Sequence, residues 1–292
     1  MESIRIANKY EIREKIGEGV FGSVFLGEKR IVGSGSGSGK KVAIKIEKEG
    51  SSSVRNESRI LEFLARNGCG KHIAQVFWYG MQEKYSILVM TFIEGISIRE
   101  KTTTPASALE WFLAAVQILE KIHSAGVIHR DIKPAHFLFW KETWYLIDFG
   151  FSTFSLESVD SSIDPMPPVL TREYIIGTPN YISIAIHNGF SPTARDDLIS
   201  LVYILLELGG KDRLPWSKTV IFPTEETEKY PGCHILQVQN QYKKKYKERW
   251  EKENMDHICY GFLQEINSTN STTSTIYSRL INRAINNINN YV

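Results

Sequence analysis

The sequence predicts an α+β protein with two lobes: a small antiparallel β-sheet lobe with one helix, followed by a larger, mostly α-helical lobe. Two observations predict this. Within residues 10–48, "YEIREKIGEG" and "VAIKIEK" alternate apolar and polar residues, and this period of two is typical of half-buried strands. After Pro105 the spacing becomes helical, beginning with the amphipathic stretch "SALEWFLAAVQILEKIHSAG", which ends at Gly126.

The elements between these two regions complete the first lobe. Residues 54–66 have apolar residues at helical spacing, and "YSILVMTFI" is typical of a buried strand. We therefore expect a single domain over residues 1–292, with a first lobe over about residues 10–90. A hinge at 91–95 would lead into a second lobe over 96–292.

A Gly/Ser repeat interrupts the predicted sheet. "GSGSGSG" at residues 33–39 alternates regularly, and such a sequence behaves as a flexible coil. We interpret it as an engineered linker that replaces a natural loop, so it enters no functional argument.

Composition places the chain among ordinary globular proteins, with 42% hydrophobic and 23% charged residues. The net charge of +2 is too small to indicate nucleic-acid binding. Cys69, Cys233 and Cys259 are too widely spaced for a metal site or a disulfide framework, which favours a reducing compartment. "MESIRIANKY" lacks the apolar core of a signal peptide, and "LISLVYILLELGG" is too short to span a bilayer. We expect a cytoplasmic or nuclear protein without a membrane partner.

The first chemical motif is "GEGVFGSV", a G-x-G-x-x-G-x-V pattern between two predicted strands. A dinucleotide-binding fold needs a helix directly after the glycines, so this position disfavours it. Glycine lets backbone N–H groups approach phosphate oxygens closely, and Phe21 at the tip could shield them from water. The candidate phosphate-binding residues are Gly17, Gly19, Val20, Phe21, Gly22 and Val24.

The second motif is "VAIK", which ends at Lys45. A lysine at the end of an apolar strand is commonly exposed at the surface. Behind a glycine loop, however, the motif is typical of an ammonium that binds the α- and β-phosphates of ATP. A carboxylate would have to hold it. Glu57 is the best candidate because the apolar face of its helix lies beside it, and Glu62 is the second choice.

Two further motifs supply carboxylates. In "HRDIKPAHF", Asp131 would accept the proton of a substrate hydroxyl, and Lys133 would offset charge on the transferred phosphoryl group. Its neighbours His129 and Arg130 are expected to be scaffold. In "LIDFG", Asp148 ends an apolar strand and is a candidate ligand for Mg²⁺.

Together, these four motifs resemble a eukaryotic-type protein kinase over about residues 10–260. "GTPNYISIAIHNGFSPTARDDLISLVYILLELGGKDRLPW" lacks the Ala-Pro-Glu of most such kinases and resembles the casein kinase 1 group, including its vaccinia-related kinase branch. The lysine-rich "QYKKKYKERWEKE" at 241–253 also resembles a helix of that group. We interpret it as a solvated helix face, with contact to an acidic substrate or partner as the alternative.

The resemblance implies further roles. Asp197 would anchor the catalytic loop, and Thr178 would contact Asp131 and Lys133. Arg172 lies near the position where members of the group carry an arginine that recognises acidic or pre-phosphorylated substrates. The adenine pocket would be formed by Ala43, Met90, Thr91 and Ile93, and the backbone from Thr91 to Ile93 would offer hydrogen bonds to adenine.

One position departs from the pattern. His136 stands where the catalytic loop normally carries a metal-binding Asn, and Mg²⁺ prefers oxygen ligands to imidazole. His136 could donate a hydrogen bond to Asp131 or hold a water that ligates the metal.

We therefore expect an active serine/threonine kinase that uses ATP with Mg²⁺, or with Mn²⁺ in its place, on protein substrates. The alternative is a pseudokinase, a nucleotide-binding scaffold or regulator that acts through protein partners. A kinase-fold enzyme for small molecules is a third option, which the pairing of Lys133 with Thr178 disfavours.

Overall fold

The computed structural model describes residues 5–18, 22–30, 39–48, 52–155, 176–209, 214–217, 233–254, 257–268 and 272–290. Several features singled out in the sequence lie outside these ranges: the glycine-loop residues Gly19, Val20 and Phe21, the linker residues 33–38, and Arg172.

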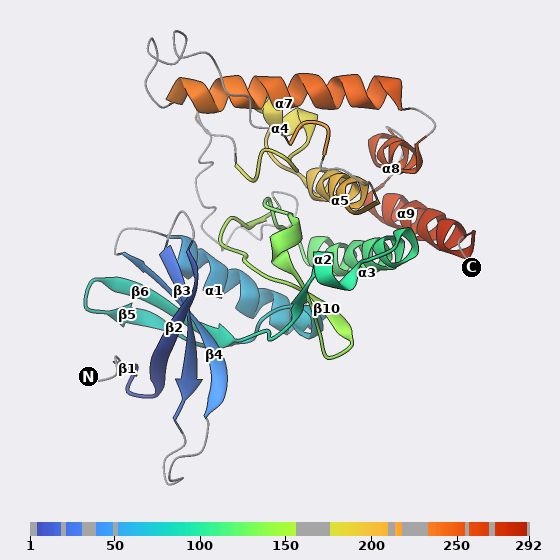
Figure 1. The fold of residues 1–292 in the computed structure, drawn as a ribbon. Coiled ribbons are helices and arrows are strands. Elements are labelled where there is room, and N and C mark those ends of the chain that lie inside the picture. The colour runs from blue at the N-terminus through green and yellow to red at the C-terminus, as the bar shows by residue number, and fades with distance from the viewer. Residues whose placement is uncertain are drawn as a thin grey trace. The chain divides into compact units, whose positions relative to one another are not determined.

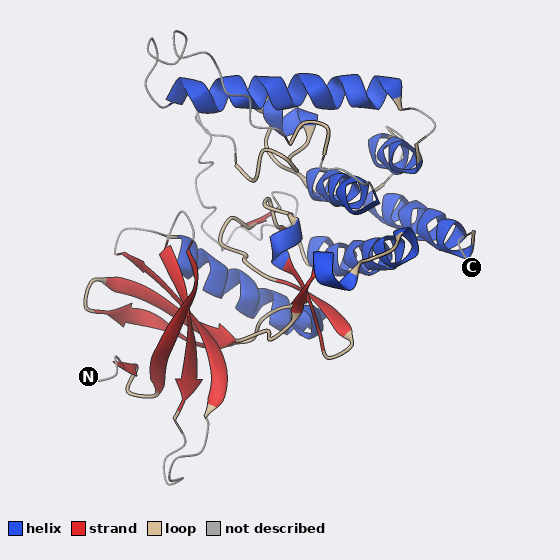
Figure 2. Cartoon of the chain, in the orientation of Figure 1, coloured by secondary structure: helices blue, strands red, loops and turns tan. Residues whose placement is uncertain are grey.

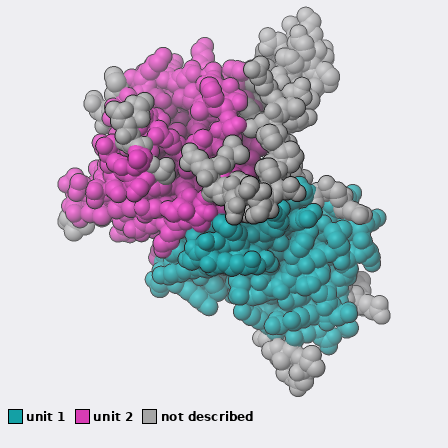
Figure 3. Space-filling view, turned by 180° about the vertical axis from the view of Figure 1, so that it is seen from behind, with its two compact units in different colours: residues 1–96, 136–152 teal, residues 97–135, 153–292 magenta. Residues whose placement is uncertain are grey.

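The chain divides into two compact units (Figure 3). The first contains residues 1–96 and 136–152, and the second contains residues 97–135 and 153–292. The first unit carries the antiparallel sheet and the second is mostly helical (Figure 2), which confirms the predicted α+β class. Residues 136–152 follow the predicted hinge in sequence but belong to the unit that holds the sheet.

A six-stranded antiparallel sheet with the order β1-β2-β3-β4-β6-β5 forms the first unit (Figure 1). Its strands are β1 (Arg5–Ile6), β2 (Tyr10–Glu18), β3 (Gly22–Lys29), β4 (Lys40–Lys48), β5 (Val76–Gln82) and β6 (Tyr85–Thr91). Helix α1 (Ser53–Leu64) contacts β4, β5 and β6 and continues into the short helical turns η1 (Ala65–Cys69) and η2 (Gly70–His72). The later part of the unit holds the antiparallel hairpin of β9 (Phe137–Trp140) and β10 (Thr143–Leu146).

Strand register gives the sheet two chemically different faces. Ile44 lies opposite Val89, and together with Val42 and Ile87 these residues belong to the buried apolar cluster. Side chains alternate between faces along a strand, so the residues between them point the other way. Lys45 lies opposite both Val24 and Leu88, and Ala43 lies opposite Met90. Val24, Ala43, Lys45 and Met90, all predicted nucleotide contacts, therefore share one face of the sheet.

The second unit is built from helices (Figure 1). They are α2 (Ile98–Lys101), α3 (Pro105–Ser124), α4 (Ile184–His187), α5 (Ala194–Gly209), α7 (Cys233–Glu253), α8 (Ile258–Asn267) and α9 (Thr273–Asn289). The short strands β8 (Val127–Ile128) and β11 (Thr153–Phe154) pair with each other, and β7 (Ile96–Ser97) and the turn η3 (Pro134–His136) lie at the unit boundaries. Helix α3 packs on α5 and α9, α5 packs on α8, and α4 packs on α7.

Local sequence explains where α3 begins and ends. The Thr104 hydroxyl accepts a hydrogen bond from the Ser107 amide (3.1 Å), the Ser107 hydroxyl accepts one from the Thr104 amide (3.0 Å), and Pro105 takes the first helical position. These contacts satisfy amides that the first turn leaves unpaired. The helix stops before Gly126, whose φ of +79° suits glycine.

The core of the second unit lies between α3, α5 and α8. Phe112 of α3 packs on Phe262 of α8 with ring centroids 4.6 Å apart, and both side chains are fully buried. Every residue of α5 from Asp196 to Leu205 is buried, so the apolar stretch that begins at Leu198 is a helix of the protein core. Among the described residues, no helix has the length and apolar character needed to cross a membrane.

Candidate active site

In the first unit, Lys45 is held between two carboxylates. Its Nζ donates to Oε2 of Glu57 at 2.7 Å and to Oδ1 of Asp148 at 2.9 Å. The Glu57 side chain is 1% exposed and that of Lys45 is 10% exposed. The predicted pair is therefore formed with Glu57. The second choice, Glu62, pairs instead with Arg66 on the protein surface.

The pKa shifts describe an ammonium that stays charged. Burial lowers the pKa of Lys45, but the charges of Glu57 and Asp148 together raise it by more than burial lowers it. The resulting pKa lies above the ordinary value of a lysine. For Glu57, burial dominates and raises the pKa of the carboxyl, although Lys45 opposes this shift. The ion pair offsets the cost of placing a carboxylate in the interior.

Asp148 lies between Lys45 and His136. The His136 Nε2 is 3.3 Å from Asp148 Oδ2, and its side chain is 7% exposed. Burial raises the pKa of Asp148, but the hydrogen bond from His136 and the charge of Lys45 lower it more, to well below the ordinary value. The backbone of Asp148 has a φ of +64°, in the left-handed region. The carboxylate is thus ionised and directed by two basic side chains.

Helix α1 also holds the segment that follows Asp148. Oε1 of Glu57 accepts a hydrogen bond from the Phe149 amide at 3.2 Å. The neighbouring Asn56 donates from Nδ2 to the Ser152 carbonyl oxygen at 2.8 Å and to the Gly150 carbonyl oxygen at 3.4 Å. Two adjacent side chains of α1 therefore bind three backbone groups after Asp148. Asn56 could not be singled out in the sequence, because an amide on a predicted helix is usually solvated.

Replacing Asn56 with Leu should lower the free energy of unfolding by about 1–3 kcal/mol, because it leaves the Ser152 carbonyl without this donor. Urea unfolding followed by fluorescence measures the change. Asn67→Leu is the matched control: Asn67 is exposed and its Nδ2 bonds the Phe63 carbonyl nearby in sequence, so its effect should stay below about 0.5 kcal/mol. Equal effects of the two substitutions would contradict the assigned role of Asn56.

The described part of the glycine motif is explained by the sheet. Gly17 lies opposite Val24 in the β2–β3 pairing. A Cβ atom at Gly22 would lie 2.2 Å from the carbonyl oxygen of Ile46 on β4. Only glycine allows that close approach of β3 to β4, so packing within the sheet already requires it.

The candidate adenine contacts lie on or next to β4 and β6. Ala43 and Ile93 are buried, and Met90 is opposite Ala43. The Thr91 amide donates to the Gln75 carbonyl oxygen at 2.9 Å. That amide is therefore already paired within the protein, whereas the resemblance implied that the backbone from Thr91 to Ile93 would bind adenine.

In the second unit, the carboxylate of Asp131 is bound on both oxygens. Oδ1 accepts a hydrogen bond from the Thr178 hydroxyl at 2.7 Å, and Oδ2 is 2.7 Å from Nζ of Lys133. The Asp131 side chain is only 3% exposed. The predicted contact of Thr178 with Asp131 is present, and Lys133 joins it through the same carboxylate.

Asp197 fixes the backbone before Asp131, as the resemblance implied. It accepts hydrogen bonds from the amides of His129 at 2.7 Å and Arg130 at 2.9 Å. Its Oδ2 is also 2.9 Å from Nε2 of His123, whose other ring nitrogen contacts the Tyr277 hydroxyl. His123 and Tyr277 were not singled out in the sequence, because 154 residues separate them.

The backbone before Thr178 approaches the same loop. Gly177 has a φ of +100°, and a Cβ atom there would lie 2.7 Å from the carbonyl oxygen of Arg130. A side chain at this position would push the two segments apart. Glycine therefore allows Thr178 to reach Asp131.

The lysine-rich helix corrects one prediction. The lysines of residues 241–253 were interpreted as a solvated face, but Lys247 is completely buried. Its Nζ donates to the carbonyl oxygens of Pro179 (3.0 Å) and Ile182 (2.5 Å), and Nζ of Lys243 donates to Oδ1 of Asn180 (2.6 Å). The interpretation is wrong for these two residues because uncharged oxygens of a distant segment, two backbone carbonyls for Lys247 and the Asn180 side-chain amide for Lys243, serve as their partners.

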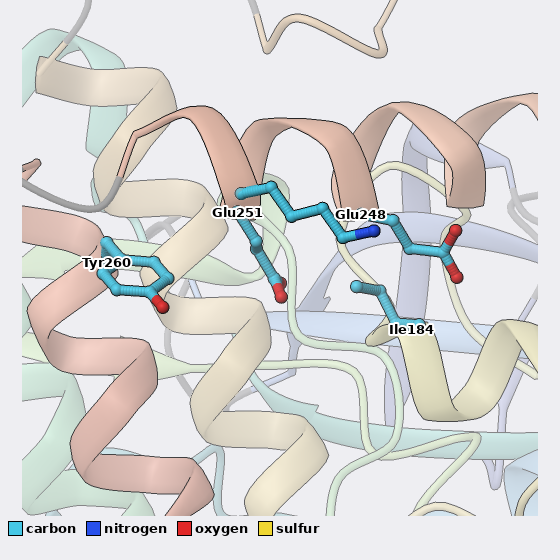
Figure 4. A pocket seen from close by; sticks show the side chains of 5 residues that line it. Ile184, Glu248, Glu251 and Tyr260 are labelled. Carbon is cyan, nitrogen blue, oxygen red and sulfur yellow. The ribbon is translucent and has the colours of Figure 1, made fainter.

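Elsewhere in the second unit, residues of α4, α7 and α8 line an open pocket of about 580 Å³. Figure 4 shows Glu248 and Glu251 on α7, with Ile184 on α4 and Tyr260 on α8 around the cavity. Oε1 of Glu251 accepts a hydrogen bond from the Tyr203 hydroxyl at 3.1 Å. None of the predicted catalytic or nucleotide-binding residues lines this pocket.

The structure thus places the predicted residues in two sets. Lys45, Glu57, Asp148 and His136 form one set in the first unit, and Asp131, Lys133 and Thr178 form another in the second. The sequence profile of the protein kinase domain matches residues 10–281, which is most of the chain and includes every member of both sets. The chain therefore belongs to the protein kinase domain family.

Proposed function

We propose that this protein is an active serine/threonine kinase, similar to the casein kinase 1 and vaccinia-related kinases, that transfers the γ-phosphate of ATP to hydroxyl groups of protein substrates. The observation that carries this proposal is the arrangement at Asp131. One oxygen of this buried carboxylate accepts the Thr178 hydroxyl, and the other is paired with Lys133. A protein that does not catalyse phosphate transfer would not need a buried carboxylate that is bound on both oxygens.

Asp131 is proposed as the group that orients the substrate hydroxyl and accepts its proton. Thr178 and Lys133 restrict the carboxylate from two sides, so it is already oriented when the substrate arrives. Lys133 is 27% exposed and can also offset negative charge on the transferred phosphoryl group. A hydroxyl of serine or threonine in an exposed segment of a protein fits this chemistry. We place acidic and pre-phosphorylated segments among the proposed substrates.

Lys45 is proposed to bind the α- and β-phosphates. Its pairing with Glu57 fixes the ammonium on the face of the sheet that also carries Val24, Ala43 and Met90. These apolar residues would contact the base. The pair of carboxylates keeps Lys45 charged, which a phosphate ligand requires.

Asp148 fits the Mg²⁺ that the family implies. Among the described residues no three His, Cys, Asp or Glu side chains gather into a metal site. Mg²⁺ in nucleotide sites needs only one or two carboxylates, because phosphates and water supply the remaining oxygens. The Asp148 side chain is ionised and 37% exposed, so it can serve as a ligand for Mg²⁺. When bound, the ion supplies positive charge that offsets the phosphate oxygens.

His136 fits a different role. Its imidazole is a poor ligand for Mg²⁺, and Nε2 already points to Asp148 Oδ2 at 3.3 Å. We propose that His136 is a positioning residue that orients the Asp148 carboxylate. This contact was not expected from the sequence, which suggested a hydrogen bond to Asp131 or a metal-bound water.

Replacing His136 with Asn should raise Mg²⁺-dependent turnover, by up to about 10-fold, because an amide oxygen suits Mg²⁺ better than an imidazole. Initial rates at saturating ATP over a series of Mg²⁺ and of Mn²⁺ concentrations measure the change. His136→Ala is the control, since it removes the contact with Asp148 without adding an oxygen. Unchanged or lower turnover in His136→Asn would show that the His136–Asp148 contact is itself needed.

The pseudokinase alternative rests on the same departure, His136 at the position of the metal-binding Asn. The test compares the wild type with Asp131→Asn and Asp148→Ala, each with ATP, Mg²⁺ or Mn²⁺, and an acidic serine-containing protein such as casein. The kinase proposal requires the wild type to transfer more phosphate than both variants. Equal transfer in both metals, with nucleotide still raising the melting temperature, would establish a nucleotide-binding scaffold instead.

A further inference from the structure

The turn that carries Thr178 is bound by a helix that follows it by more than fifty residues. The amides of Tyr181 and Ile182 donate to the Thr178 carbonyl oxygen at 2.8 and 3.2 Å, which closes the turn. Lys247 of α7 then binds the carbonyl oxygens of Pro179 and Ile182 at 3.0 and 2.5 Å. One side-chain nitrogen therefore joins both ends of the turn.

A second lysine, one helical turn earlier, strengthens this contact. Nζ of Lys243 donates to Oδ1 of Asn180 at 2.6 Å and to the Trp216 carbonyl oxygen at 3.0 Å. The Trp216 indole N–H returns a hydrogen bond to the Asn180 carbonyl oxygen at 2.8 Å. The turn is thus bound at Pro179, Asn180 and Ile182 by two lysines of α7, and at Asn180 also by Trp216.

The surroundings of Lys247 show that burying this side chain in the core costs folding free energy. Its side chain is fully buried, and Nζ contacts two carbonyl oxygens and Nε2 of His187 at 3.1 Å. The rings of Tyr203 and Trp216 lie 4.9 and 5.6 Å from Nζ. Burying a lysine among neutral acceptors stabilises a fold less than an apolar residue of similar size would. What the lysine provides is a fixed backbone conformation.

We propose that Lys247, supported by Lys243, is a positioning residue that fixes the turn after Thr178 and so sets the affinity for the protein substrate. This inference rests on the proposed kinase function. Few contacts separate Lys247 from the proposed catalytic residue. Lys247 binds the carbonyl groups of the turn, and the hydroxyl of Thr178, at the start of the turn, donates to Asp131 Oδ1 at 2.7 Å. The turn lies directly beside the proposed catalytic carboxylate, where the segment of the substrate around the reacting hydroxyl would bind.

Lys247→Met tests the proposal, since methionine keeps most of the buried volume and removes the donors. Lys245→Met is the matched control on an exposed position of the same helix. With a serine-containing peptide taken from casein, kcat/KM should fall by about 10- to 100-fold in Lys247→Met, while KM for ATP stays within about twofold. Unchanged peptide kinetics, or an equal rise of both KM values, would overturn the proposal.

A second measurement does not depend on activity. Hydrogen exchange should accelerate in peptides covering residues 177–187 of Lys247→Met and stay unchanged in α3 and α5. Unchanged exchange in that segment, or faster exchange throughout the second unit, would overturn the positioning role even in a protein that transfers no phosphate. If Lys247→Met does not fold, Lys243→Met answers both questions, because Lys243 is only partly buried and binds the same turn.

Discussion

Replacing Asp131 with Asn should lower the rate of phosphate transfer by about 10² to 10⁴-fold. The amide keeps the size of the side chain and one oxygen that can accept the Thr178 hydroxyl, which bonds Oδ1 at 2.7 Å. It cannot take the proton from the substrate, and it removes the negative charge that Lys133 faces at 2.7 Å. Transfer of radioactive phosphate to casein at saturating ATP measures the loss.

Two controls separate this chemistry from general damage. Glu110→Gln makes the same change of charge on an exposed position of α3 and should leave the rate unchanged. The melting temperature in the presence of ATP should respond equally in Asp131→Asn and the wild type, since Lys45 and Asp148 are intact. A variant that keeps more than about a tenth of the wild-type rate would exclude Asp131 as the proton acceptor.

The sequence predicted those parts of the site that depend on short-range pattern. Alternation of apolar residues predicted that Lys45 lies on a strand, although β4 continues past it to Lys48, and strand register puts it on the same face as Val24 and Met90. Glu57 could be chosen over Glu62 because helical spacing shows which side of α1 is apolar. Each of these inferences needs only a few neighbouring residues.

Contacts between distant segments were beyond such inference. The partners of Asn56 lie 94 and 96 residues away, and those of Lys247 lie 60 to 68 residues away. Their partners are backbone carbonyls or a neutral ring, which leave no trace in composition or charge pattern. Their residue types also favoured the wrong interpretation, since lysines and asparagines on predicted helices are usually exposed to solvent. The contact between His136 and Asp148 was missed because it depends on how the β9–β10 hairpin folds back.

Replacing Lys45 with Met should lower the free energy of unfolding by about 3–5 kcal/mol at pH 8, besides removing the phosphate-binding charge. Glu57, whose side chain is 1% exposed, would then be a buried carboxylate without its ammonium partner at 2.7 Å. Asp148 would lose a partner too, but it is 37% exposed and keeps His136. The cost should therefore come mainly from Glu57.

The dependence on pH identifies that source. Burial already raises the pKa of Glu57, and loss of Lys45 removes the largest contribution that opposes the shift. The folded variant would then hold a proton on Glu57 at pH values where the unfolded chain has released it. Stability of Lys45→Met should consequently fall as pH rises above the unfolded carboxyl pKa of about 4.5, and it should be recovered at low pH. A variant equally destabilised at pH 5 and pH 8 would contradict this account.

The double variant Lys45→Met/Glu57→Gln separates stability from function. Glutamine removes the buried charge and keeps an oxygen for the Phe149 amide, which bonds Glu57 at 3.2 Å. Most of the lost stability should return, and its dependence on pH should disappear, whereas phosphate transfer should stay at least about 100-fold below the wild type. Recovered transfer would show that Lys45 serves only the fold. Recovered stability without transfer would assign Lys45 to the nucleotide, with Glu57 as the group that makes a charged lysine tolerable in the interior.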